Sequence, residues 1–139
     1  MHVVIGGFGR VGRYLARMLE EGGHSVAVID HSEAVFDAFG HDLKGRRLLG
    51  EIFDRETLLK AGIERADAFA AVTSGDNSNI VAARVAKERF AVPVVIARIY
   101  DPRRAAIYAR YDIPTISSVQ WASSRFLEMI QHPGTTLGD

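Results

Sequence analysis

Short apolar runs alternate along the chain with longer segments in which apolar side chains recur every three or four positions. The runs are rich in valine, isoleucine and alanine, as in buried strands, and the longer segments are typical of amphipathic helices. We predict strands at residues 2–5, 25–30, 47–50, 67–72, 94–98 and 114–116. Helices are expected at residues 10–21, 33–39, 55–61, 77–90, 102–107 and 119–130.

The ends of these helices carry the expected boundary residues. Ser32 and Asp54 stand where a side-chain oxygen caps a helix, and Gly22, Gly40 and Gly62 stand where helices end. Strands that alternate with helices at this spacing indicate a parallel sheet covered on both faces. We therefore predict an α/β fold, a Rossmann-like doubly wound parallel sheet of six strands.

The predicted organisation has three parts. Residues 1–118 form the main lobe, residues 119–131 form a separate last helix, and residues 132–139 form a linker or tail. The chain shows no internal repeat and no low-complexity segment.

Composition narrows the class of protein. The 139 residues carry 17 basic and 17 acidic side chains, so the net charge of zero gives no reason to expect a nucleic-acid partner or an anionic membrane surface. Cysteine is absent, which excludes disulfides and thiol nucleophiles. No apolar run reaches the roughly 20 residues of a membrane span, and the first strand leaves no room for a signal peptide. We expect a cytoplasmic protein without direct membrane insertion.

A glycine motif between the first strand and the first helix carries the chemistry. It reads Gly7-Phe8-Gly9-Arg10-Val11-Gly12, the G-x-G-x-x-G fingerprint of dinucleotide-binding folds. The first glycine permits a tight turn, the second lets the backbone approach a pyrophosphate, and the third lets the helix pack on the strand. The helix N-terminus then presents N–H groups to phosphates.

Asp30 ends the second strand about 20 residues after the motif, as the fingerprint requires. A carboxylate there accepts hydrogen bonds from ribose hydroxyls and repels a 2′-phosphate, so NADP is disfavoured. The alternative is that the glycines only form a turn and Asp30 only ends a strand.

Several further motifs, taken in order, make the chain resemble the RCK domain, also called KTN or TrkA-N. The resemblance covers residues 1–131 and rests on the glycine motif and on Val28-Ile29-Asp30, Gly50-Glu51, Ala61-Gly62-Ile63, Ala66-Asp67, Asp76-Asn77-Ser78-Asn79 and Ala97-Arg98-Ile99-Tyr100-Asp101-Pro102. It implies a cytoplasmic regulatory domain of a potassium channel or of a Trk/Ktr-type uptake transporter, with residues 1–118 as the nucleotide-binding lobe and residues 119–131 as a crossover helix that reaches a partner subunit. Such domains bind NAD(H) or the adenine nucleotides ATP, ADP and AMP, and they assemble as dimers and rings.

The resemblance also implies site residues. The glycine loop and Arg10 would meet phosphates, and Asp30 would hold the ribose. The remaining implied contacts are His31 and Ser32 beside the ribose, Glu51 and Ile52 beside the adenine, Thr73, Ser74 and Gly75 at the end of the fourth strand, and Arg98 at the end of the fifth. The chain departs from the family at Ile52, where relatives commonly have alanine after an acidic residue, and at Val119-Gln120, where many have proline and glutamate.

Other roles compete for some of these residues. Arg10 and His31 also fit solvated surface positions, and Asp76 fits a helix N-cap as well as a site residue. The five histidines lack metal-binding spacings, so no metal site is expected.

Two functions from different classes fit a Rossmann domain. One is the cofactor-binding half of an NAD-dependent oxidoreductase, but no histidine or lysine stands where a hydride-transfer base is expected, so we favour a regulatory binding module over an enzyme. The last helix carries Trp121, Phe126, Leu127, Met129 and Ile130, which favours homodimerisation over packing on its own sheet.

Overall fold

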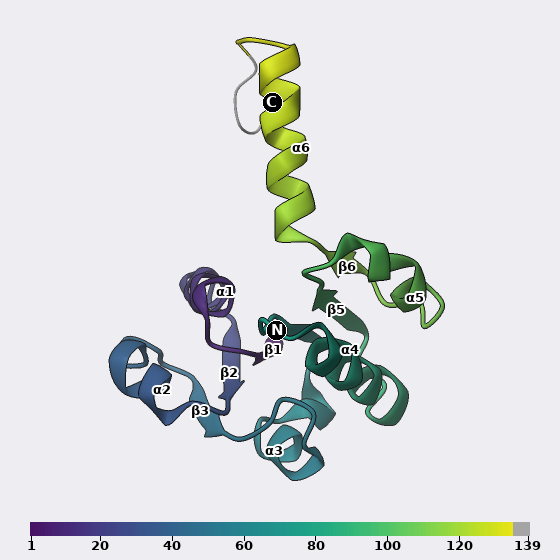
Figure 1. Ribbon diagram of the computed structural model, residues 1–139. Helices are drawn as coiled ribbons and strands as arrows, with labels where there is room; N and C mark the ends of the chain where they lie inside the picture. Colours follow the sequence, from purple (N-terminus) through teal and green to yellow (C-terminus); the bar gives the residue numbers. More distant parts are fainter. Residues whose placement is uncertain (135–139) are drawn as a thin grey trace.

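The computed structural model describes residues 1–134 and contains a six-stranded sheet in which every strand pair is parallel (Figure 1). The strand order is β3-β2-β1-β4-β5-β6. The strands from β1 to β3 are added toward one edge of the sheet and those from β4 to β6 toward the other, so the order switches between β1 and β4. This confirms the predicted doubly wound fold. The strands are β1 (His2–Gly6), β2 (Ser25–Asp30), β3 (Arg46–Leu49), β4 (Ala68–Ala71), β5 (Val94–Arg98) and β6 (Thr115–Ile116).

Six α-helices connect and follow these strands, close to the predicted positions. Ser32 caps the second by accepting from the Val35 N–H at 3.3 Å, and Asp54 caps the third by accepting from the Thr57 N–H at 3.0 Å. The helices are α1 (Arg10–Glu21), α2 (Glu33–Phe39), α3 (Arg55–Lys60), α4 (Asp76–Arg84), α5 (Ala105–Ala109) and α6 (Ser118–Gln131).

Three short turns adjust the predicted boundaries. The helix expected over 77–90 is α-helical only to Arg84 and continues as one turn of π-helix over Val85–Arg89. The spacing of apolar residues does not reveal this change. Pro102–Arg104 forms a 3-10 turn ahead of α5, and Ile63–Arg65 forms another ahead of β4.

Alternate residues of each strand point to opposite faces of the sheet, and each face has its own core. On the first face, β1 and β2 residues such as Ile5 and Val28 pack with Ala16 of α1 and Phe36 of α2. On the second face, residues of β1, β2, β4 and β5 pack with α3 and α4, and Phe69 is among them.

The first face is covered over only part of its width. Partners in a parallel pair point to the same side, so Val3↔Ala68↔Val94 and Ile5↔Ala70↔Ile96 continue this face into β4 and β5. Val94 is 50% exposed, and Ile116 of β6, the partner of Arg98, is 56% exposed. The α1–α2 side of β5 and β6 is therefore an exposed, largely apolar strip.

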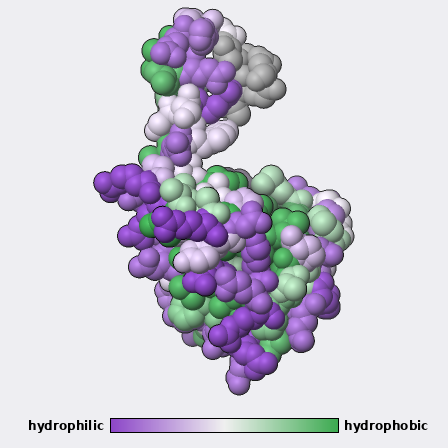
Figure 2. Space-filling view, turned by 90° about the vertical axis from the view of Figure 1, so that its right-hand side faces the viewer, coloured by the Kyte–Doolittle hydropathy of each residue, from purple (hydrophilic) through white to green (hydrophobic). Residues whose placement is uncertain are grey.

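Helix α6 projects away from the sheet instead of covering that strip (Figure 1). Figure 2 shows it as a separate column above the body of the molecule. Within residues 118–131 no side chain is fully buried, and Phe126 and Ile130 are 71% and 73% exposed. Of the predicted linker or tail, residues 135–139 lie outside the described residues.

Candidate functional site

The glycine loop joins β1 to α1 beneath the end of β4. Gly7 has φ +118°, and its N–H donates to the Ile29 carbonyl at 2.7 Å. A Cβ at this position would lie 3.0 Å from the Thr73 backbone nitrogen. Glycine is therefore required at position 7 by both backbone conformation and space.

Gly9 and Gly12 have different surroundings. A Cβ on Gly12 would lie 2.0 Å from the Gly7 carbonyl oxygen, so α1 packs directly on the loop. A Cβ on Gly9 would meet no atom within 4 Å, and Gly9 occupies the N-cap of α1 without capping it by a side chain. The space beside Gly9 at the N-terminus of α1 is thus open, an arrangement that suits an anion.

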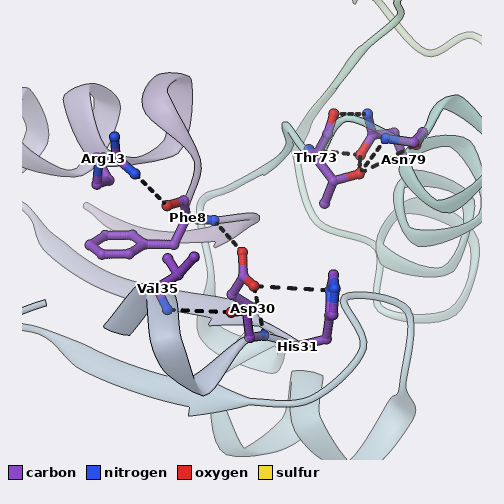
Figure 3. Close-up of polar contacts among 9 residues, drawn as sticks. Phe8, Arg13, Asp30, His31, Val35, Thr73 and Asn79 are labelled. Carbon is purple, nitrogen blue, oxygen red and sulfur yellow. Dashed lines mark hydrogen bonds and ion pairs between the residues drawn. The ribbon is translucent and has the colours of Figure 1, made fainter. Parts of the chain in front are cut away.

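Asp30 fastens the end of β2 to this loop (Figure 3). Its Oδ2 accepts from the Phe8 N–H at 2.8 Å, and its Oδ1 accepts from the Ser32 N–H at 2.8 Å. The His31 Nδ1 atom lies 3.9 Å from Oδ1, and the Asp30 side chain is 13% exposed. Each carboxylate oxygen keeps a further lone pair, which leaves Asp30 able to accept from a ligand hydroxyl.

The end of β4 forms the wall of the candidate site that lies across from Asp30. Thr73 is held there by Asn79 of α4, whose Oδ1 accepts from the Thr73 N–H at 3.0 Å and from its hydroxyl at 2.7 Å (Figure 3). Ser74 and Gly75 follow and are exposed. Together with α4 and the loop after β5, they line a recess of about 320 Å³.

Asp76 has a role that the sequence did not suggest. The N-cap position of α4 belongs to Gly75, and the Asp76 carboxylate instead accepts from the N–H groups of Tyr100 and Asp101, at 2.6 and 3.1 Å. It thereby holds the loop after β5 against the start of α4.

Ionisable groups near this loop have shifted pKa values, among them Tyr108 and Asp101. Burial raises the pKa of the Tyr108 phenol, whose hydroxyl donates to the Asp76 carbonyl at 3.2 Å. A hydrogen bond from the Arg103 guanidinium lowers the pKa of the Asp101 carboxyl. Asp101 therefore stays ionised at neutral pH, next to the recess.

The structure does not bring every predicted side chain to this edge. The Phe8 side chain is buried against Phe36, with ring centroids 5.3 Å apart. Ile52 is buried over Gly6, where an added Cβ would lie 3.0 Å from the Ile52 Cβ. At Phe8 and Ile52 only the main chain is available to a ligand, because the apolar side chains complete the core.

The remaining predicted residues stay near the surface. Arg10, Val11, His31 and Glu51 are exposed, and the Ser32 hydroxyl is engaged in capping α2. Arg98 is half-buried at the carboxyl end of β5, on the same face as Ile116.

Asn79 was not singled out as a site residue, although the sequence carries a signal for it. Positions 79, 82, 83 and 86 share one helical face, and the other three are alanines, so this face is buried. A polar residue on a buried face needs hydrogen-bond partners, and those of Asn79 lie at the candidate site.

This combination defines a class of protein. A doubly wound sheet, a glycine loop at the crossover point between β1 and β4, and an acidic residue ending β2 are the features of the Rossmann-type fold. The family model of the TrkA-N domain matches residues 3–119. The chain belongs to the TrkA-N domain family.

Curated relatives share this sequence over most of the chain. The Trk system potassium uptake protein TrkA of Streptomyces coelicolor is 55% identical over 134 residues, which cover 96% of this chain and 60% of the relative. A TrkA homolog of Pyrococcus abyssi is 38% identical over 108 residues, covering 78% of this chain and 48% of the relative. The chain thus spans about half to three fifths of their length.

Solved structures with 18–20% identity share the fold. The AMP-bound Kef C-terminal domain of Shewanella denitrificans aligns with a TM-score of 0.83 at 20% identity, covering 98% of this chain and 84% of that one. GsuK bound to ADP gives 0.79 at 20% identity over 94% and 34% of the chains, and the GsuK channel bound to NAD gives 0.77 at 18% identity over 92% and 23%.

The described residues show neither a membrane-spanning helix nor a metal cluster. Across residues 1–134, no helix has the length and apolarity needed to cross a membrane. The same residues contain no cluster of three or more His, Asp or Glu side chains arranged to hold a metal ion.

Proposed function

We propose that this chain is the nucleotide-binding regulatory domain of a Trk-type potassium uptake system, acting on the cytoplasmic side of a membrane transporter. The observation that carries the proposal is the Asp30 carboxylate bonded to the Phe8 N–H, which places an acidic acceptor beside a glycine loop that is open at Gly9. The names of the TrkA relatives support the assignment to potassium uptake.

The ligand is NAD(H) or an adenine nucleotide such as ATP, ADP or AMP. Its phosphates lie over Gly9 at the N-terminus of α1 with Arg10 beside them, and a ribose hydroxyl donates to Asp30. A 2′-phosphate would meet the Asp30 charge, which disfavours NADP. Thr73, Ser74, Gly75 and Arg98 form the far wall.

The working unit is a homodimer formed through α6. Val119, Ala122, Phe126 and Ile130 recur every three or four residues and form one apolar stripe, whereas Trp121, Arg125 and Glu128 lie on another side of the helix. A second copy offers the exposed strip with Val94 and Ile116 as a receiving surface. Such apolar patches are typical of interfaces.

The nucleotide site and the exposed strip lie next to each other, which couples ligand binding to dimer assembly. Arg98 ends β5 at the nucleotide edge, and its strand partner Ile116 lies in the exposed strip. A nucleotide that prefers one arrangement of the dimer shifts the assembly by its difference in affinity, and dimers joined in a ring pass that shift to the transporter.

Titration calorimetry with AMP, ADP, ATP, NAD, NADH and NADP tests the proposal. We expect saturable binding of at least one adenine nucleotide or NAD form and weaker binding of NADP than of NAD. Failure of all six to bind would overturn the proposal.

A separate assay tests the oxidoreductase alternative. The chain is incubated with NADH and a panel of ketones and aldehydes while absorbance is followed at 340 nm. We expect no protein-dependent oxidation, and turnover would move the function into the enzyme class.

A further inference from the structure

Asn79 uses its whole amide group at the edge of the sheet. Its Oδ1 accepts twice from Thr73, and its Nδ2 donates to the Thr73 carbonyl at 2.9 Å and to the Arg98 carbonyl at 3.0 Å. The side chain is 0% exposed. An amide has two donor hydrogens and two acceptor lone pairs, so all four positions are occupied.

The partners of Asn79 lie where two strands separate. The last paired residues of β4 and β5 are Ala71 and Ala97, and Thr73 lies beyond that pairing. The Asn79 side chain bonds both the N–H and the carbonyl of Thr73, as a neighbouring strand would, and also bonds the end of β5. It therefore takes the place of strand pairing at the point where β4 and β5 diverge.

The hydrogen bonds of Thr73 also fix the loop that follows it. Its hydroxyl oxygen accepts from the Gly75 N–H at 3.1 Å, and the Gly75 carbonyl in turn accepts from the Asn79 N–H at 3.0 Å. Residues 73–75 thus form a closed set of hydrogen bonds around one buried side chain.

We propose that Asn79 is a positioning residue for nucleotide binding, which fixes the backbone of Thr73 and Arg98 as one wall of the site without touching the ligand. The inference rests on the proposed function. A loop held in its bound conformation before the ligand arrives loses less entropy on binding, so affinity depends on Asn79.

Asn79→Ala tests this role, with two control variants. Arg84→Ala shortens a side chain at the other end of the same helix, where the Arg84 Nε donates to Glu88 at 3.1 Å, away from the recess. Val92→Ala lowers stability at the opposite end of β5, where Val92 is buried. We expect the dissociation constant for AMP, at a temperature where all variants are folded, to rise about tenfold in Asn79→Ala and to stay within about twofold in the controls.

Hydrogen exchange supplies a readout that is independent of the ligand. The Thr73 amide should exchange faster in Asn79→Ala than in either control, because its acceptor is the Asn79 side chain. Unchanged exchange at Thr73, or an AMP affinity equal to that of the controls, would overturn the inference while the proposed function stands. A wild-type chain that binds no nucleotide would overturn both.

Asn79→Asp gives a second test if the alanine variant does not fold. The new carboxylate keeps the acceptor toward Thr73 but faces the Thr73 and Arg98 carbonyls with a negative oxygen. A buried carboxyl takes up a proton more readily than an exposed one and then donates again. The ratio of variant to wild-type dissociation constant should therefore fall as the pH is lowered, and a ratio independent of pH would contradict the role of the Nδ2 donor.

Discussion

The carboxylate of Asp30 and the backbone N–H of Phe8 are joined by a 2.8 Å hydrogen bond, which links the end of β2 to the glycine loop after β1. The same carboxylate holds the Ser32 N–H at the start of α2. Asp30 thus supports the shape of the glycine loop, in addition to the ribose contact proposed for it.

Asp30→Ala should weaken adenine-nucleotide binding by about 2 kcal/mol, because a charge-assisted hydrogen bond to the ribose is lost and the loop loses its tie. Asp37→Ala, on the exposed side of α2, is the matched control and should bind as the wild type does. Calorimetry measures both. Equal affinities of the two variants would exclude Asp30 from the site.

Substitutions at two glycines of the loop should affect stability and nucleotide binding separately. Gly12→Ala places a Cβ 2.0 Å from the Gly7 carbonyl oxygen and should lower the free energy of unfolding by about 1–3 kcal/mol. Gly9→Ala places its Cβ in open space, so the melting temperature should be unchanged while nucleotide affinity falls. Thermal denaturation and calorimetry on both variants check the pair. A Gly9→Ala variant with full affinity would show that phosphates do not approach position 9.

We expect Arg10 to distinguish ligands by the length of their phosphate chain. It begins α1 and is exposed, so its charge is available to phosphates beyond the one nearest the helix N-terminus. Arg10→Ala should weaken ATP more than AMP, and added salt should weaken the wild type more than the variant. Arg17→Ala, on the same helix but against Tyr14, is the control. Equal losses for ATP and AMP would mean that Arg10 contacts no distal phosphate.

Assembly is tested on α6 and on its proposed receiving strip. Phe126→Glu and Ile116→Glu each place a charge on an exposed apolar residue and should shift the dimer towards monomer in sedimentation at micromolar concentration. Trp121→Glu should shift it less, since Trp121 lies on the side of the helix with Arg125 and Glu128. Ser124→Glu is the matched control. A wild-type monomer would contradict dimerisation through this helix.

Local features were predictable from the sequence because neighbouring residues determine them. Ser32 and Asp54 cap helices through bonds that span three residues, and Gly7 is fixed by its own backbone conformation. The partners of Asn79 and Asp76 were not predictable, because Arg98 and Tyr100 lie 19 and 24 residues further along the chain. The burial of Ile52 depends on Gly6, which lies far earlier in the sequence, before β2 and β3.

Because α6 is attached at one end only, a small rotation at its start moves its far end by a much larger distance. The helix leaves β6 at Ser117, whose hydroxyl accepts from the Gln120 N–H at 3.1 Å, and has 14 residues, so it is about 21 Å long. A rotation of about 10° at Ser117 carries its far end through about 4 Å, by the arithmetic of that length. A small change of direction where β6 ends would therefore be magnified into a much larger displacement at the far end of the helix.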